Sequence, residues 1–124
     1  MELKVYICEH CGNIVMKVKD QGVPVMCCGQ KMKELIPGTT DAAAEKHVPT
    51  YQVQGNLVQV TVGSVEHPML PAHDIEWIAL KTKQGVQLKE LKPDEKPAAV
   101  FSLADADEVE EVYAYCNLHS LWKA

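Results

Sequence analysis

The residues of this chain that could do chemistry are its cysteines and histidines. Near the C-terminus, Cys116 ends an alternating run that is typical of a β-strand, and His119 follows three positions later. A thiolate and an imidazole at this spacing can bind one metal ion from a turn without distorting the backbone. A buried free cysteine beside an unrelated histidine is the plainer interpretation. Three more histidines upstream, His47, His67 and His73, argue against it.

A second set of thiols lies near the N-terminus. Cys8 and Cys11 are separated by two residues, and Cys27 and Cys28 follow as an adjacent pair after fifteen more. Zinc is the usual ion for four thiolates when the cysteines of each pair are spaced apart. Here Cys27 and Cys28 are adjacent, which forces a wider, distorted tetrahedron of sulfurs around the metal. The module resembles desulforedoxin, a rubredoxin-like protein with one iron among four cysteines of this spacing. This resemblance implies iron on all four cysteines and leaves His10 as an exposed neighbour.

The length of 124 residues suits a small module joined to a larger domain. The cysteine-containing segment is too short to build its own core, so a metal has to stabilise it. Pro37-Gly38-Thr39-Thr40 interrupts the pattern and marks a linker. We therefore expect an iron module over residues 1–37 and a second domain over residues 38–124.

Short alternating segments separated by turn residues dominate the second domain. They predict a mainly β fold, an antiparallel, immunoglobulin-like β-sandwich. The expected strands are residues 51–54, 57–62, 75–82, 86–91, 98–104 and 111–116. A short helical turn over Ala42–Ala44, capped by Thr40 or Asp41, is expected to end before Pro49.

The four histidines and Cys116 all fall in loops or at strand ends of this sandwich, where they can converge. Five donors exceed the four that a structural zinc takes, and they suit a redox iron with one position open to a small molecule. Singly, His67 before Pro68 and His73 before Asp74 could be ordinary loop residues. Together with Cys116 they predict a second metal site.

These motifs resemble those of desulfoferrodoxin, the two-iron form of superoxide reductase, over the full length. The matching segments are Glu45-Lys46-His47-Val48-Pro49, His67-Pro68-Met69 with His73, Cys116-Asn117-Leu118-His119, and the four-cysteine module. The resemblance implies an active iron with four equatorial histidines (His47, His67, His73 and His119) and an axial cysteine (Cys116). It also implies two iron ions per chain and one-electron reduction of superoxide to hydrogen peroxide.

Glu45 and Lys46 are the expected catalytic residues, because they directly precede a ligand. Lys46 would attract the superoxide anion and organise proton delivery through water, and the resemblance implies that Glu45 binds the ferric iron after the product leaves. Two solvated loop charges are the alternative. The four-thiolate iron is more negative than the histidine iron, so electrons are expected to flow toward the histidines. The axial thiolate of Cys116 should favour release of peroxide with its O–O bond intact.

Composition excludes several other functions. The net charge is -5 and all twelve basic residues are lysines, which argues against a nucleic-acid partner. No apolar run approaches the roughly 18 residues of a membrane span. Met1 leads into Glu2-Leu3-Lys4 without a signal-peptide pattern, so a cytoplasmic protein with reduced thiols is expected.

Two other functions fit parts of the pattern. A cupredoxin-like electron carrier without catalysis would use an early histidine and a late Cys-x2-His, but it needs a methionine after His119 and leaves His67 and His73 idle. A pair of zinc sites in an interaction module would be redox silent. The resemblance further implies rubredoxin or a similar electron donor, and a homodimer.

Overall fold

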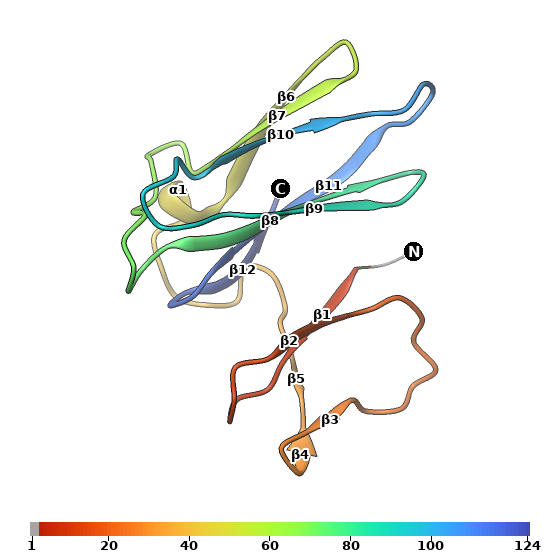
Figure 1. Cartoon of the computed structure of the whole chain (residues 1–124), viewed down its shortest axis with the longest axis vertical. Helices are drawn as coiled ribbons and strands as arrows, with labels where there is room; N and C mark the ends of the chain where they lie inside the picture. Colours follow the sequence, from red (N-terminus) through yellow and green to blue (C-terminus); the bar gives the residue numbers. More distant parts are fainter. Residues whose placement is uncertain (1–2) are drawn as a thin grey trace. The chain divides into compact units, whose positions relative to one another are not determined.

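The computed structural model describes residues 3–124, which form two compact units divided between Ile36 and Pro37 (Figure 1). The first unit is built from short antiparallel pairings. Its three-stranded sheet has the order β2 (Ile14–Lys17), β1 (Lys4–Ile7), β5 (Lys33–Glu34), and its two-stranded sheet pairs β3 (Met26–Cys27) with β4 (Gln30–Lys31).

The second unit contains two antiparallel sheets. One sheet has the order β10 (Ala98–Ser102), β7 (Leu57–Val62), β6 (Pro49–Gln54). The other has the order β12 (Ser120–Lys123), β11 (Val109–Cys116), β8 (Ile75–Thr82), β9 (Val86–Glu90). Among the described residues one helix occurs, the single turn α1 (Ala44–His47), and none is long and apolar enough to cross a membrane.

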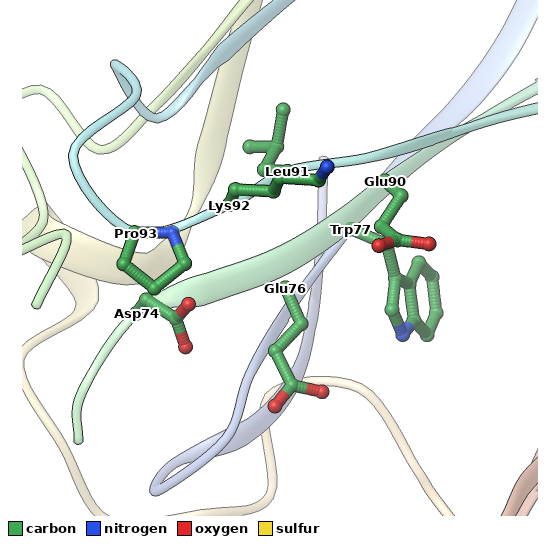
Figure 2. Close-up of a pocket in the computed structure, with 7 residues that line it drawn as sticks. All are labelled: Asp74, Glu76, Trp77, Glu90, Leu91, Lys92 and Pro93. Carbon is green, nitrogen blue, oxygen red and sulfur yellow. The ribbon is translucent and has the colours of Figure 1, made fainter. Parts of the chain in front are cut away.

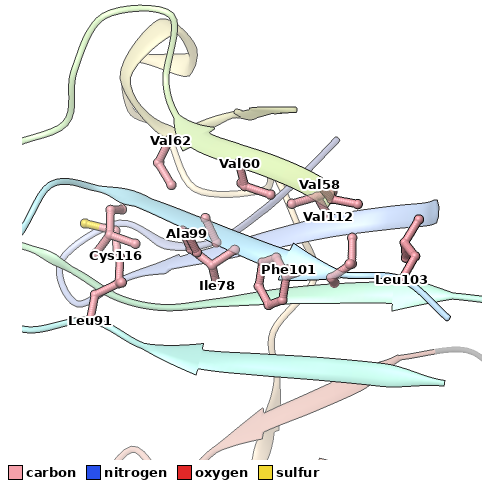
Figure 3. Close-up of a cluster of buried hydrophobic side chains, with 13 residues drawn as sticks. Val58, Val60, Val62, Ile78, Leu91, Ala99, Phe101, Leu103, Val112 and Cys116 are labelled. Atoms are coloured by element: carbon pink, nitrogen blue, oxygen red, sulfur yellow. The ribbon is translucent and has the colours of Figure 1, made fainter. Parts of the chain in front are cut away.

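The core lies between these two sheets (Figure 3). Strand β7 alternates strictly, so that Val58, Val60 and Val62 are buried while their neighbours face solvent. Their partners come from the facing sheet and from Phe101 of β10. Cys116 lies at one end of this cluster (Figure 3). The mainly β fold and the sandwich predicted from the alternating pattern are therefore confirmed.

The helical turn lies later in the chain than expected. It covers Ala44–His47 rather than Ala42–Ala44, and its N-cap residue Ala43 makes no side-chain capping bond. Instead, the Val48 N–H donates to the Ala44 carbonyl at 2.9 Å, which closes the turn just before Pro49. The shift places Glu45, Lys46 and His47 within the helical turn itself.

Candidate metal centres

Five donors predicted from the sequence converge at one end of the second unit. Their donor atoms all lie within 4.8 Å of one another, and we call this group the histidine centre: His47, His67, His73, Cys116 and His119. Figure 1 shows α1, the β7–β8 connection and the β11–β12 turn at the same end of the sandwich. Loops far apart in the sequence thus supply one site, as expected.

Hydrogen bonds fix the protonation of two of the rings. The Nδ1 atoms of His47 and His67 lie 2.7 Å and 2.6 Å from the carbonyl oxygens of Ala43 and Pro68. A carbonyl only accepts, so each Nδ1 carries the proton and each Nε2 keeps a lone pair. These two Nε2 atoms are only 3.1 Å apart. Two lone pairs at this distance repel unless a cation lies between them.

The other donors complete the set. His73 Nε2 is buried and has no hydrogen-bond partner among the described residues, which is unfavourable for a polar atom without a metal. His119 presents Nδ1, which lies 3.1 Å from His47 Nε2 and 3.8 Å from Cys116 Sγ. The centre therefore offers three Nε2 atoms, one Nδ1 atom and one sulfur.

Burial sets the charge of these donors. Desolvation lowers the pKa of His47, and it lowers the pKa of His67 to about 4. Both rings are neutral near pH 7, as metal binding requires. Burial also raises the pKa of the Cys116 thiol, against the opposing effect of the Leu118 and His119 amides. A thiolate here needs a nearby cation, so the residues fit a metal ion.

Trp122 supports the histidine centre and was not identified from the sequence. Its ring stacks on His47 with centroids 5.0 Å apart and an interplanar angle of 26°. Its Nε1 donates to the carbonyl of His119 at 2.9 Å. One buried side chain thus contacts two ligands, and the only sequence signal was its position three residues after His119.

The predicted cysteines form the second group in the first unit. Cys8, Cys11, Cys27 and Cys28, which we call the cysteine centre, have their sulfurs within 4.8 Å of one another. The Sγ atoms of Cys11 and Cys27 are 3.7 Å apart, close to the roughly 3.8 Å expected for sulfurs 2.3 Å from one tetrahedral metal. His10 is exposed, as expected.

The thiols of the cysteine centre differ in acidity. The backbone N–H of Cys11 is the main cause that lowers the pKa of Cys8 to about 6. The pKa of Cys28 is raised to about 12, chiefly by its side-chain hydrogen bond with Cys11. The Cys8 thiolate therefore forms easily, whereas Cys27 and Cys28, whose pKa values are both raised, resist ionisation without a cation. This pattern also fits a metal ion held by four thiolates.

Glu45 and Lys46 are exposed on α1 next to the histidine centre. Neither forms an ion pair within residues 3–124. The Glu45 carbonyl accepts hydrogen bonds from the Val65 N–H at 3.0 Å and the Ser64 hydroxyl at 3.3 Å. The backbone is therefore fixed while both charged side chains remain free in solvent.

A separate pocket of about 360 Å³ lies over β8 and β9 (Figure 2). Its lining carries three carboxylates, from Asp74, Glu76 and Glu90, and one ammonium, from Lys92. Burial is the main cause that raises the pKa of Glu76, and the charges of Asp74 and Glu90 raise it further. This lining repels anions, so an anionic substrate is excluded from it.

Fold and sites together define a mainly β protein with a four-thiolate centre in one unit and a four-imidazole, one-thiolate centre in the other. The family model of desulfoferrodoxin matches residues 39–124, and the chain belongs to this family. It is 48% identical to the desulfoferrodoxin of Nitratidesulfovibrio vulgaris, over 99% of this chain and 96% of the relative. It is 45% identical to that of Clostridium acetobutylicum, over 99% and 96% of the two chains.

Solved structures agree with this assignment. The crystal structure of the superoxide reductase from Treponema pallidum superposes with a TM-score of 0.86 at 41% identity, covering 100% of this chain and 99% of that chain. A superoxide reductase of Giardia intestinalis, described as 1Fe-SOR, gives a TM-score of 0.56 at 34% identity over 64% of this chain and 95% of its own.

Proposed function

We propose that the chain is a superoxide reductase with one iron in the histidine centre and another in the cysteine centre. The observation that carries the proposal is the convergence of four imidazoles and the Cys116 sulfur, whose donor atoms all lie within 4.8 Å of one another, in a member of the desulfoferrodoxin family. The four imidazoles and Cys116 would hold an iron ion that would supply one electron to superoxide, and the reduced anion would take up two protons and leave as hydrogen peroxide. The family and the donor set both support this reaction.

Lys46 is assigned the capture of the anion. Its ammonium is exposed beside His47 and has no carboxylate partner among the described residues, so its charge is available to an approaching anion. The net charge of -5 and the carboxylates of the β8–β9 pocket repel superoxide elsewhere. Lys46 is also assigned the organisation of proton delivery to the product through water.

Glu45 is assigned as the carboxylate that binds the oxidised centre once the product has left. Its backbone is held by Ser64 and Val65, while its side chain is exposed. A fixed backbone with a free side chain allows the carboxylate to move toward and away from a metal without refolding α1. Cys116 is the thiolate whose electron donation favours product release.

The cupredoxin-like alternative is disfavoured by the position of two histidines. His67 and His73 would have no role in such a carrier, yet both converge with Cys116. The chain also lacks a methionine between His119 and its last residue.

The decisive experiment is anaerobic iron quantitation followed by pulse radiolysis of superoxide on the reduced protein. Two irons per chain and a second-order reaction that oxidises the histidine centre and yields one peroxide per electron are expected. Bound copper, bound zinc, or a reduced protein that leaves superoxide to decay at its uncatalysed rate would refute the proposal.

The electron donor, the assembly state and the location form part of the same proposal. Turnover needs an external one-electron donor, for which rubredoxin or a similar protein is proposed. A cytoplasmic location fits a protein whose five cysteines are all unpaired. A homodimer is supported by exposed apolar side chains on the small first unit, among them Val18 and Val23 at 83% and 68% exposure. Sedimentation of the holoprotein tests the dimer.

We also propose that residues 1–37 form a desulforedoxin-like four-cysteine iron module and that residues 38–124 form the superoxide reductase domain that carries the catalytic iron. The division of the chain into compact units at Ile36 and Pro37 supports this assignment.

A further inference from the structure

We propose that Asn117 is a positioning residue of the histidine centre, whose side-chain amide fastens the Cys116–His119 turn to the segment that carries His73. The proposal rests on the metal site proposed above and not on the reaction with superoxide. Asn117 is not one of the five residues that make up the centre, and both ends of its side-chain amide are hydrogen-bonded to backbone. Its part is to hold two groups of ligands, far apart in the sequence, in one arrangement.

Three hydrogen bonds join Asn117 to the two chain neighbours of His73. The Asn117 Nδ2 donates to the Ala72 carbonyl at 3.0 Å, and the Asp74 N–H donates to Asn117 Oδ1 at 3.0 Å. The Asn117 N–H donates to the Asp74 carbonyl at 3.3 Å. The backbone is thus held immediately before and immediately after His73.

These bonds take over where the strand pairing fails. Strand β11 pairs regularly with β8 from Glu111 to Tyr115, which lies opposite Trp77, and the register then shifts so that Cys116 lies opposite Ile75. Such an irregularity ends the regular ladder and bends the strand. Beyond it, the side-chain amide of Asn117 supplies a donor and an acceptor in place of a further ladder pair. The bend allows the Cys116 and His119 side chains to face the metal site. The hydrogen bonds of Asn117 then hold the β11–β12 turn to the Ala72–Asp74 segment in place of strand pairing.

Asparagine is suited to this position by its chemistry. The arrangement needs one acceptor and one donor on the same planar group, about two bonds from the Cα atom. Aspartate has the same shape but offers no donor, and its charge would face the Ala72 carbonyl. Alanine offers neither group. The side chain can therefore be tested with a change that keeps its volume and removes a single hydrogen bond.

The three hydrogen bonds of Asn117 matter for the position of His73, which lies between Ala72 and Asp74. The described residues offer no hydrogen bond to its buried Nε2, so the position of this nitrogen depends on the backbone that carries the ring. If the Asn117 bonds are lost, His73 can turn away from the centre. Removal of groups that orient metal ligands typically lowers metal affinity about 10- to 100-fold, so we expect the histidine centre to release its iron faster by up to about the same factor.

The test compares N117D and N117A with wild type as iron-loaded, full-length proteins. Release of both irons to a ferrous chelator is followed under anaerobic conditions, and the two centres are distinguished by their absorption. N56A is the matched control, because Asn56 also donates a side-chain hydrogen bond, to Asp105, in the β6–β7 turn, which carries no ligand of either centre. The cysteine centre provides a second control within each molecule.

A spectroscopic readout separates orientation from general stability. The electron paramagnetic resonance signal of the oxidised histidine centre should change in N117D and N117A and stay unchanged in N56A. Faster release confined to the histidine centre, together with the changed signal, supports the inference. Release no faster than in N56A would overturn it, and so would equal acceleration at both centres with an unchanged signal. A wild-type protein that binds no metal at its histidines would overturn the proposed function as well.

Discussion

The Nε2 atoms of His47 and His67 lie 3.1 Å apart, and neither has a proton to place between them. The proton of each ring is on Nδ1, where it is hydrogen-bonded to a backbone carbonyl on the opposite side of the ring from Nε2. The protein therefore holds two lone pairs in contact and a third unpartnered nitrogen, that of His73, close by. This arrangement is preorganised for a cation and is unfavourable without one.

Removal of the metal should therefore destabilise the second unit. A ligand present at 100 times its dissociation constant adds about 2.7 kcal/mol to the free energy of unfolding, so the melting temperature should fall by roughly 10 to 20 °C in the metal-free protein. Calorimetry of the metal-free and the iron-reconstituted protein measures the change. Equal melting temperatures would show that the imidazoles tolerate their contact without an ion.

The sequence predicts most of this fold because its strands are strongly patterned. Residues 57–62 and 75–82 were expected as strands, and the structure has β7 and β8 with the same bounds. Their alternation or continuous apolar character is local, so it can be read without knowledge of the partners. The ligand set was likewise predictable, because cysteine and histidine in loops have few other roles in combination.

Features that depend on tertiary contacts could not be predicted. The helical turn was placed too early because a capping residue was assumed, whereas α1 is closed by the backbone and held by the segment around Ser64. Strand β12 was missed because Ser120, which begins it, has a φ of +68°, a value that residues other than glycine seldom adopt. Asn117 and Trp122 acquire roles only through partners distant in the sequence or across a turn.

Replacement of Trp122 should loosen two ligands at once. W122F keeps an aromatic face toward His47 but removes the donor to the His119 carbonyl. We expect its free energy of unfolding to fall by about 1 to 2 kcal/mol. W122A removes both contacts and should cost about 3 to 5 kcal/mol. Urea titration of the holoprotein measures these losses. The idea of a shared support fails if W122A costs no more than W122F.

Neutralisation of Lys46 should slow the capture of superoxide and leave the iron in place. For K46A we expect about a tenfold lower second-order rate and a weaker dependence on ionic strength, while K46R should retain most of the rate. K19A is the matched control, since Lys19 is an exposed lysine of the other unit with the same charge. Pulse radiolysis at several salt concentrations is the measurement, and equal rates for K46A and K19A would contradict a local role.

Asp20 should make the first unit sensitive to acid. The Gly22 N–H, followed by the Lys17 and Lys4 ammonium groups, holds the pKa of Asp20 well below its ordinary value. A carboxyl with a depressed folded-state pKa stabilises the fold above its unfolded pKa of about 3.9, and this stabilisation is lost as the pH falls further. The difference in urea midpoint between wild type and D20N should be constant from pH 7 to about 5 and shrink below pH 4. A difference independent of pH would contradict the assignment.

Gly63 provides the sharpest test of how α1 is held. Its φ of +84° is unfavourable for other residues, and a Cβ atom there would lie 2.4 Å from the Val65 carbonyl oxygen and 2.8 Å from those of Glu45 and Lys46. All three contacts are to backbone, and two of them are to carbonyls of α1, so that relief of the overlap would displace the helical turn or the segment at Val65. G63A should therefore lower the free energy of unfolding by at least about 3 kcal/mol, because backbone strain and steric overlap act together.

Gly55 separates these two causes. It has a φ of +61°, but a Cβ atom there would meet nothing within 4 Å, so G55A suffers the strain alone, about 1 to 2 kcal/mol. Because α1 carries Glu45, Lys46 and His47, G63A should also lower the rate with superoxide, whereas G55A should leave it unchanged. Urea titration and pulse radiolysis of both variants measure the two effects. Equal losses of stability with equal rates would mean that close packing at Gly63 does not position the helical turn.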